Sequence, residues 1–363
     1  MNKRYDILKI IFITLFLSLV FDLFLGKNLY KKFIRKNFKD VGSSYAIPSD
    51  IFHHNFKKNF KGLAGWGNVN YDFCTDGNGF RDSCLNQFSD TKEFDIAFIG
   101  DSFTEASGVN YEDSFIGLIS SNFKNKKIAN LGISSYSPTI YYAKINYLLN
   151  AGYQFKEIIV FIDLSDLIDD TACYTLKGNK VIQRKTFPSC FRNNSIKKNM
   201  IFNFFTSNFY LMSHFFNFIK SKVVKYKVPQ EIINHSRSDW TYNYKKENHN
   251  NYEYEESIKI IKQNMLKLSE LLRTKNIDLS IAVYPWPNTL INDTENNKQA
   301  KLWKEFCIVN CKNFYNFMTI FFKEVKKTNF TEVYQKYYIQ DDIHMNIEGH
   351  KAISNFFINN YIE

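Results

Sequence analysis

Short apolar runs alternate with helical patterns along most of the chain, and this alternation is the strongest constraint on its fold. The first run, 94–100, ends in Gly100. Further strand-like runs lie at 128–131, 158–162 and 279–284, and helical patterns lie at 111–123, 140–150 and 256–273. Strands that alternate with helices form a parallel, doubly wound sheet, and runs that are apolar throughout are typical of strands buried on both faces. We therefore predict an α/β fold with a parallel sheet.

The N-terminus carries a different kind of apolar segment. Residues 10–25 read IIFITLFLSLVFDLFL, and only Asp22 interrupts them. As a helix this segment is about 24 Å long, somewhat less than a full hydrocarbon core. The alternative is a signal peptide, but the following residues, GKNLYKKF, contain no small-x-small cleavage site. We expect a transmembrane anchor over 8–26, an N-terminal extension over 27–90 and a catalytic domain over 91–363.

Lysines and cysteines give opposite indications about the compartment. Basic residues are more numerous after the apolar segment than before it, so the positive-inside rule alone would leave the body in the cytoplasm. The six cysteines form three local couples, which are Cys74 with Cys84, Cys173 with Cys190, and Cys307 with Cys311. Local disulfides would require an oxidising compartment, whereas unrelated thiols would not. The last couple would be strained on a regular helix. We expect an inner-membrane-anchored protein with a periplasmic or otherwise extracytoplasmic body.

The net charge and the sequence motifs limit the classes of ligand that the chain is expected to bind. The net charge is +11, but the lysines are scattered and accompany no nucleic-acid motif, so we expect no nucleic-acid partner. The chain has no P-loop and no Rossmann glycine fingerprint, and we expect no cofactor and no metal.

Residues 171–250 interrupt the α/β pattern. They contain an aromatic stretch over 200–219, where apolar positions recur at helical spacing. We expect a mainly helical insertion packed on the core. The alternative is a lid, or a helix on the membrane surface, beside the active site.

Ser102 follows the first apolar strand directly, in the segment Gly100-Asp101-Ser102. Ligands of parallel sheets bind at the carboxyl ends of the strands, so a nucleophile fits this position. A serine here can also simply cap the next helix. A base elsewhere in the chain would favour the nucleophile.

His344 near the other end of the chain is the candidate base. It lies in Gln340-Asp341-Asp342-Ile343-His344, just before a final helix over 351–361. An imidazole takes the hydroxyl proton of a serine nucleophile, and a carboxylate fixes the tautomer of the ring. Asp341 and Asp342 both have a suitable spacing, and the choice between them stays open.

These segments resemble the blocks of the SGNH (GDSL-like) hydrolase family. Gly100-Asp101-Ser102 resembles the first block, and Asp341-Asp342-Ile343-His344 resembles the last. Asn130-Leu131-Gly132 resembles the second block, so Gly132 is expected to donate its amide to the oxyanion hole. In the third block Ser165 stands where the family has Asn, and the loss of one donor from an oxyanion hole typically costs about 10²–10³ in rate.

The resemblance implies a three-layer α/β/α sandwich with a flavodoxin-like sheet. It also implies an esterase with an acyl-serine intermediate and an oxyanion hole formed by Ser102, Gly132 and Ser165. Residues 79–82 and 284–287 are further similar to a bacterial envelope-associated branch that is linked to acyl groups on surface glycans. The expected substrate is therefore an acylated, for example O-acetylated, envelope glycan or a small ester. The alternatives are an O-acyltransferase to a surface polysaccharide and a catalytically silent binding protein with the same fold.

Overall fold

The computed structural model describes residues 3–29, 45–67, 69–85, 89–184, 209, 211–212, 227–243 and 254–362. The chain divides into two compact units. One unit comprises 1–40 and 191–227, and the other, which we call the sheet unit, comprises 41–190 and 228–363.

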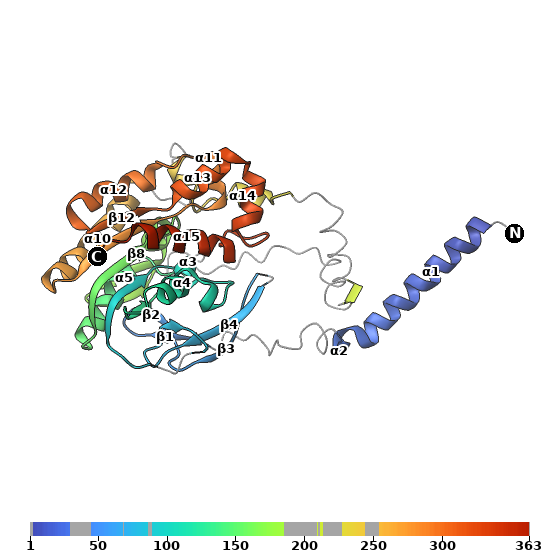
Figure 1. Ribbon diagram of the computed structural model, residues 1–363, viewed down its shortest axis with the longest axis horizontal. Helices are drawn as coiled ribbons and strands as arrows, with labels where there is room; N and C mark the ends of the chain where they lie inside the picture. Colours follow the sequence, from blue (N-terminus) through green and yellow to red (C-terminus); the bar gives the residue numbers. More distant parts are fainter. Residues whose placement is uncertain are drawn as a thin grey trace. The chain divides into compact units, whose positions relative to one another are not determined.

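A large mixed sheet forms the centre of the sheet unit (Figure 1). Its strands are β3 (Lys61–Trp66), β4 (Val69–Thr75), β5 (Arg81–Asp82), β6 (Glu93–Ile99), β7 (Ile128–Asn130), β8 (Gln154–Phe161), β11 (Asp278–Val283) and β12 (Asn313–Asn316). Their order in the sheet is β12-β11-β8-β6-β7-β5-β4-β3. The strands from β12 to β7 are parallel, and numbered along the chain they have the order 2-1-3-4-5 of flavodoxin-like sheets. The predicted parallel sheet is therefore present.

Helices connect and cover these strands. The longer ones are α4 (Phe115–Asn122), α5 (Pro138–Asn150), α10 (Tyr254–Thr274), α12 (Lys298–Asn310), α13 (Met318–Lys327), α14 (Phe330–Tyr337) and α15 (Ile347–Asn360). The short ones are α3 (Ser102–Glu105), η3 (Tyr111–Asp113), α6 (Asp166–Ile168), η4 (Asp169–Cys173), α9 (Gln230–Ile233), η6 (Asp239–Thr241) and α11 (Pro287–Asn292). The strand order reverses direction after β7, so right-handed crossovers place α4 and α5 on opposite faces of the sheet. α4 packs against α15, and α5 packs against α10.

The N-terminal extension is part of the same sheet. β5 pairs antiparallel with β7, and β4 and β3 continue the antiparallel order to the sheet edge (Figure 1). A separate hairpin, β1 (Ala46–Ser49) with β2 (His53–Phe56), precedes these strands. The sequence predicts only an N-terminal extension over 27–90, and in the structure strands of this extension form the edge of the sheet.

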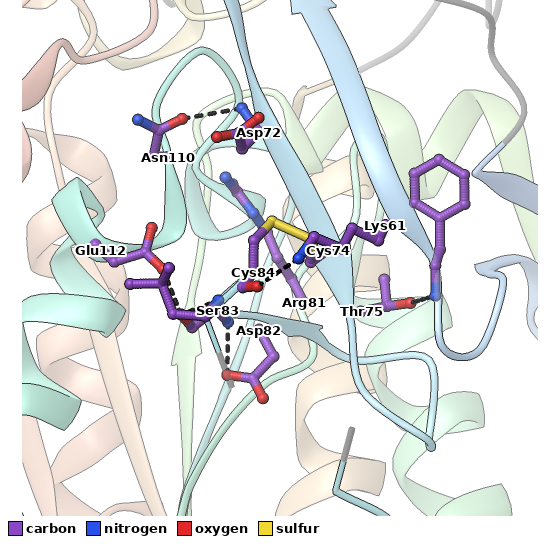
Figure 2. Close-up of a disulfide and its surroundings, with 12 residues drawn as sticks. Lys61, Asp72, Cys74, Thr75, Arg81, Asp82, Ser83, Cys84, Asn110 and Glu112 are labelled. Carbon is purple, nitrogen blue, oxygen red and sulfur yellow. Dashed lines mark hydrogen bonds between the residues drawn. A yellow bond between two sulfur atoms is a disulfide. The ribbon is translucent and has the colours of Figure 1, made fainter. Parts of the chain in front are cut away.

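A disulfide and a buried arginine fasten this edge to the rest of the fold. Cys74 of β4 is bonded to Cys84, just after β5, and Figure 2 shows this disulfide beside Arg81. The Arg81 side chain is buried and donates to the backbone carbonyls of Glu105, Ala106 and Val109, with 2.6 Å to the Ala106 oxygen. These carbonyls lie at and just beyond the end of α3. Arg81 therefore fixes the turn that follows Ser102.

The other cysteines are also disulfide-bonded in the described part of the chain. Cys307 is bonded to Cys311, because α12 ends at Asn310 and Cys311 is extended, with φ −126° and ψ 155°. A regular helix over both residues would have strained the bond. Cys173 is disulfide-bonded as well, and its predicted partner Cys190 lies outside the described residues.

The expected transmembrane helix over 8–26 is not found. No helix among the described residues is both long enough and apolar enough to cross a bilayer. Regular helix α1 (Lys3–Phe21) begins among charged residues and gives way to the π-helical turn η1 (Asp22–Gly26) and the short α2 (Lys27–Leu29). The apolar part of α1 is therefore only about 18 Å long. The buried Asp22 carboxylate accepts hydrogen bonds from the backbone N–H groups of Leu211 and Met212, at 3.0 and 2.7 Å.

The insertion is not mainly helical where it is described. It starts with η4 and an antiparallel hairpin, β9 (Tyr174–Lys177) with β10 (Lys180–Gln183), and ends with α9 and η6. Most of the aromatic stretch over 200–219 lies outside the described residues. Sequence analysis missed the hairpin because its strands are short and only one of their side chains besides Tyr174 is buried.

His350 makes part of the stability of the fold dependent on pH. Its ring is buried in α15, stacks on Phe115 at 5.8 Å and accepts the Phe115 N–H at Nδ1, at 3.3 Å. Burial lowers the pKa of His350 to about 3. Between this value and the ordinary pKa of about 6.5, the unfolded chain binds more protons, so stability falls as the pH falls through this window.

A His350→Asn variant should therefore lose less stability on acidification than the wild type. Asn can still accept the Phe115 N–H but does not titrate. The pH slope of the free energy of unfolding should decrease by up to about 1.4 kcal/mol per pH unit below pH 6. Urea unfolding at pH 7.5 and pH 5 measures this slope, and parallel slopes in the two proteins would contradict the prediction.

Candidate active site

Ser102 lies at the carboxyl end of the central strand β6. It is the first residue of α3, and its side chain is 8% exposed. The helix cap is Asp101, whose carboxylate accepts the Phe103 N–H at 3.0 Å. A first-turn N–H has no helical carbonyl to bind, so the Ser102 amide points away from the helix as a donor. Gly100 allows this tight turn, because a Cβ at its position would lie 2.8 Å from the Phe161 carbonyl oxygen.

His344 and Asp342 complete a triad with Ser102. His344 Nε2 lies 2.7 Å from Ser102 Oγ, and His344 Nδ1 lies 2.6 Å from Asp342 Oδ1. A tight loop holds the histidine, since the His344 carbonyl accepts the Ile339 N–H at 2.8 Å. Asp342, and not the exposed Asp341, faces the ring. The structure thus places the two predicted residues from opposite ends of the domain in one hydrogen-bonded chain and decides between the two aspartates.

Asp342 is held as a carboxylate. Burial alone would raise its pKa, but hydrogen bonds from the imidazole and backbone N–H of His344, together with one from Trp66, outweigh burial and lower the pKa of Asp342 below its ordinary value. The His344 backbone N–H lies 2.9 Å from Asp342 Oδ1. A carboxylate in this position can orient the imidazole and stabilise the imidazolium that forms when the serine loses its proton.

Two aromatic side chains enclose the His344 ring. Phe103 stacks on it with ring centroids 4.4 Å apart, and Trp66 meets it edge-on at 4.5 Å. Trp66 is the last residue of β3 and precedes His344 by 278 positions. Sequence analysis missed Trp66, because a single aromatic in a polar segment carries no local signal of a distant partner.

The predicted oxyanion donors Gly132 and Ser165 have intramolecular partners. The Gly132 N–H donates to Asn130 Oδ1 at 2.9 Å, and Ser165 Oγ donates to Asp169 Oδ2 at 3.4 Å. Gly132 packs tightly against α3, where a Cβ would lie 2.7 Å from the Glu105 nitrogen. Gly132 and Ser165 both follow the carboxyl ends of strands of the parallel sheet, β7 and β8. Their role in binding an oxyanion stays a prediction.

Behind the triad lies a cluster of buried aspartates, comprising Asp101, Asp163, Asp166 and Asp169. Burial, with the neighbouring aspartates adding to it, raises the pKa of Asp101 and Asp166 well above the ordinary value. Asp101 accepts from the Tyr284 hydroxyl at 3.2 Å, Asp163 from the Trp286 indole at 2.7 Å and Asp166 from the Tyr141 hydroxyl at 2.9 Å. Trp286 is fully buried, so it serves packing and hydrogen bonding.

The insertion contributes an arginine and a histidine beside this cluster. Arg237 forms an ion pair with Asp169, and its side chain is 42% exposed. His235 contacts the Trp286 ring edge-on at 4.8 Å. The Trp240 indole fixes this segment by donating to the Leu164 carbonyl at 2.9 Å. A position of the insertion beside the active site was only the alternative in the sequence analysis, which singled out neither Arg237 nor His235.

Within the described residues, no group of three or more His, Cys, Asp or Glu side chains is arranged to hold a metal ion. The groups that the structure brings together at Ser102 are a hydroxyl, an imidazole and a carboxylate. Their arrangement can activate a hydroxyl for attack on a carbonyl carbon.

No protein-family model and no curated protein matches the sequence. Solved structures are similar to it. A lipolytic protein of the G-D-S-L family from Veillonella parvula is 10% identical, with a TM-score of 0.42 and coverage of 74% of this chain and 97% of that one. A catalytic mutant of an acetylxylan esterase from Geobacillus stearothermophilus is 13% identical, with a TM-score of 0.39 and coverage of 73% and 93%.

A psychrotrophic esterase from Pseudoalteromonas is 10% identical, with a TM-score of 0.39 and coverage of 74% and 96%. The parallel strand order and the contacts among Ser102, His344 and Asp342 are those that the resemblance to SGNH hydrolases implies.

Proposed function

We propose that the chain is an ester hydrolase of the SGNH type that works through an acyl-serine intermediate. The continuous hydrogen-bonded chain from Ser102 through His344 to Asp342 is the observation that carries the proposal. Ser102 Oγ attacks the ester carbonyl while His344 Nε2 takes the hydroxyl proton. His344 then returns this proton to the leaving alcohol. Water, deprotonated by the same imidazole, hydrolyses the acyl-serine and releases the acid.

The negative charge that develops on the carbonyl oxygen needs hydrogen-bond donors. The Ser102 amide is available as a first-turn N–H, and we propose that the Gly132 amide and the Ser165 hydroxyl join it. The latter two must first leave Asn130 and Asp169, which bind them in this structure. This competition predicts a weaker hole than one with an Asn in the third block.

The proposed substrate is an acyl ester, most simply an O-acetyl ester, of an envelope glycan or a related small ester. The resemblance to the envelope-associated branch supports this choice, and one similar structure is of an acetylxylan esterase. If a sugar hydroxyl replaces water as the acceptor, the same acyl-serine makes the protein an O-acyltransferase. The Arg237 side chain, which pairs with Asp169, is partly exposed and can meet water as well as a sugar hydroxyl.

A fluorophosphonate probe tests the proposal directly. The purified full chain should react with it and should carry the phosphonyl adduct on Ser102, as located by peptide mass spectrometry. It should also release p-nitrophenol from p-nitrophenyl acetate. Absence of both reactions in the folded protein would contradict the hydrolase and favour a silent SGNH-fold binding protein. Acetate release from an acetylated glycan, with and without a second sugar acceptor, then separates hydrolysis from transfer.

A further inference from the structure

We propose that Trp66 is a positioning residue for the catalytic histidine and aspartate, supplied by the N-terminal extension. This inference rests on the proposed function, because it concerns the same triad. It assigns a role at the active site to the antiparallel edge of the sheet, which lies outside the α/β part of the fold.

The position of Trp66 is set by the β3–β4 hairpin. Trp66 pairs with Val69 at the end of the hairpin, and Gly67 in the turn has a φ of +55°. A Cβ at Gly67 would lie 3.7 Å from Asp342 Oδ2, so the turn itself lies against the carboxylate. The Trp66 Nε1 atom is 3.1 Å from His344 Nδ1. The hairpin therefore brings an indole N–H to the contact between the imidazole and the carboxylate.

The chemistry of the triad decides what this N–H binds. When His344 Nε2 accepts the Ser102 hydroxyl, its proton is on Nδ1 and points to Asp342 Oδ1, 2.6 Å away. A protonated Nδ1 has no lone pair for the indole. The remaining acceptor is the Asp342 carboxylate, and a hydrogen bond from Trp66 is among the causes that lower the pKa of Asp342.

The indole N–H lies 3.1 Å from Nδ1 in the structure, and once Nδ1 carries its proton the N–H turns to the adjoining Asp342 carboxylate, which also accepts from the imidazole and backbone N–H groups of His344. The indole also blocks one edge of the His344 ring, while Phe103 covers its face. Both effects hold the imidazole in the tautomer and orientation that Ser102 needs. The hydrogen bond from the indole N–H also draws electron density from the Asp342 carboxylate, and this weakens the stabilisation that the carboxylate gives to the imidazolium.

Replacement of Trp66 by Phe removes the N–H and keeps an aromatic ring. We expect kcat/KM for p-nitrophenyl acetate to fall about tenfold, because a hydrogen bond to a charged group is lost. A carboxylate with one donor fewer stabilises the imidazolium more strongly, so the acid limb of the kcat/KM profile should move to higher pH. Trp66→His, which retains an N–H donor, should recover part of the rate.

Trp303→Phe is the matched control. Trp303 is a buried Trp in α12 whose Nε1 has no hydrogen-bond partner among the described residues, so the substitution removes none of the hydrogen bonds described. A loss of rate in Trp66→Phe without movement of the acid limb, equal to the loss in Trp303→Phe, would reduce Trp66 to ordinary packing and overturn the proposal. An unchanged rate and an unchanged profile would also overturn it.

The NMR signals of His344 test this inference independently of the proposed function. NMR of protein with ¹⁵N-labelled histidine, with His344→Gln for assignment, follows the imidazole without any turnover. If the wild type fails to hydrolyse esters, the proposed function fails, yet the ¹H and ¹⁵N signals of the His344 Nδ1–H group, which the indole contacts, should still shift in Trp66→Phe. Identical Nδ1–H signals in the two proteins would overturn the role of Trp66.

Discussion

Replacing Ser102 with alanine should lower kcat for ester hydrolysis by about 10⁴–10⁶-fold. The substitution removes the nucleophile that His344 Nε2 contacts at 2.7 Å. It should leave the fold intact, since Asp101, and not Ser102, caps α3. The hydroxyl makes one further contact, with Asp101 Oδ2 at 3.4 Å, so the change in the free energy of unfolding should stay below about 1 kcal/mol.

The measurement is hydrolysis of p-nitrophenyl acetate by the wild type and the variant, with thermal unfolding as a check on the fold. Ser121→Ala is the matched control, because Ser121 is an exposed serine of α4 whose hydroxyl donates to the Leu118 carbonyl of its own helix. It should retain full activity. If purified Ser102→Ala kept a tenth of the wild-type rate, another group would be the nucleophile.

Asp342→Asn should lower kcat by about 10⁴-fold, whereas Asp341→Asn should change it less than about threefold. An Asn amide at position 342 would place a donor or a weak acceptor where the imidazole Nδ1–H now meets a carboxylate, so His344 would adopt the wrong tautomer or lose its orientation. Asp341 is exposed and has a φ of +61°, a conformation that Asn also tolerates.

Steady-state kinetics of the two asparagine variants decide this prediction. The pair is closely matched, because the substitutions are chemically identical and lie one residue apart. Equal losses in the two variants would mean that the loop, and not the carboxylate on the ring, is what the histidine requires. Retention of near wild-type kcat by Asp342→Asn would remove Asp342 from the triad.

The N-terminal segment shows how a local pattern and the folded chain can differ. An apolar stretch over 10–25 predicts a membrane span, and that prediction stays a prediction, whereas in the structure regular helix ends at Phe21 and Asp22 is buried against the backbone of Leu211 and Met212. Hydropathy counts apolar side chains, and it does not register where the helical hydrogen-bond pattern changes. The partners of Asp22 lie almost two hundred residues away, beyond the reach of any local pattern.

The sequence by itself determined the parallel α/β sheet and pointed to Ser102 and His344, the residues that we propose as nucleophile and base. These depend on local periodicity and on short segments at strand ends, which follow from the physics of burial along a single strand or helix. Only the tertiary structure decided between Asp341 and Asp342, made β3 to β5 part of the sheet and brought Trp66 to His344. These outcomes depend on contacts that the tertiary fold creates. The separation of two residues along the chain does not give their separation in the folded protein.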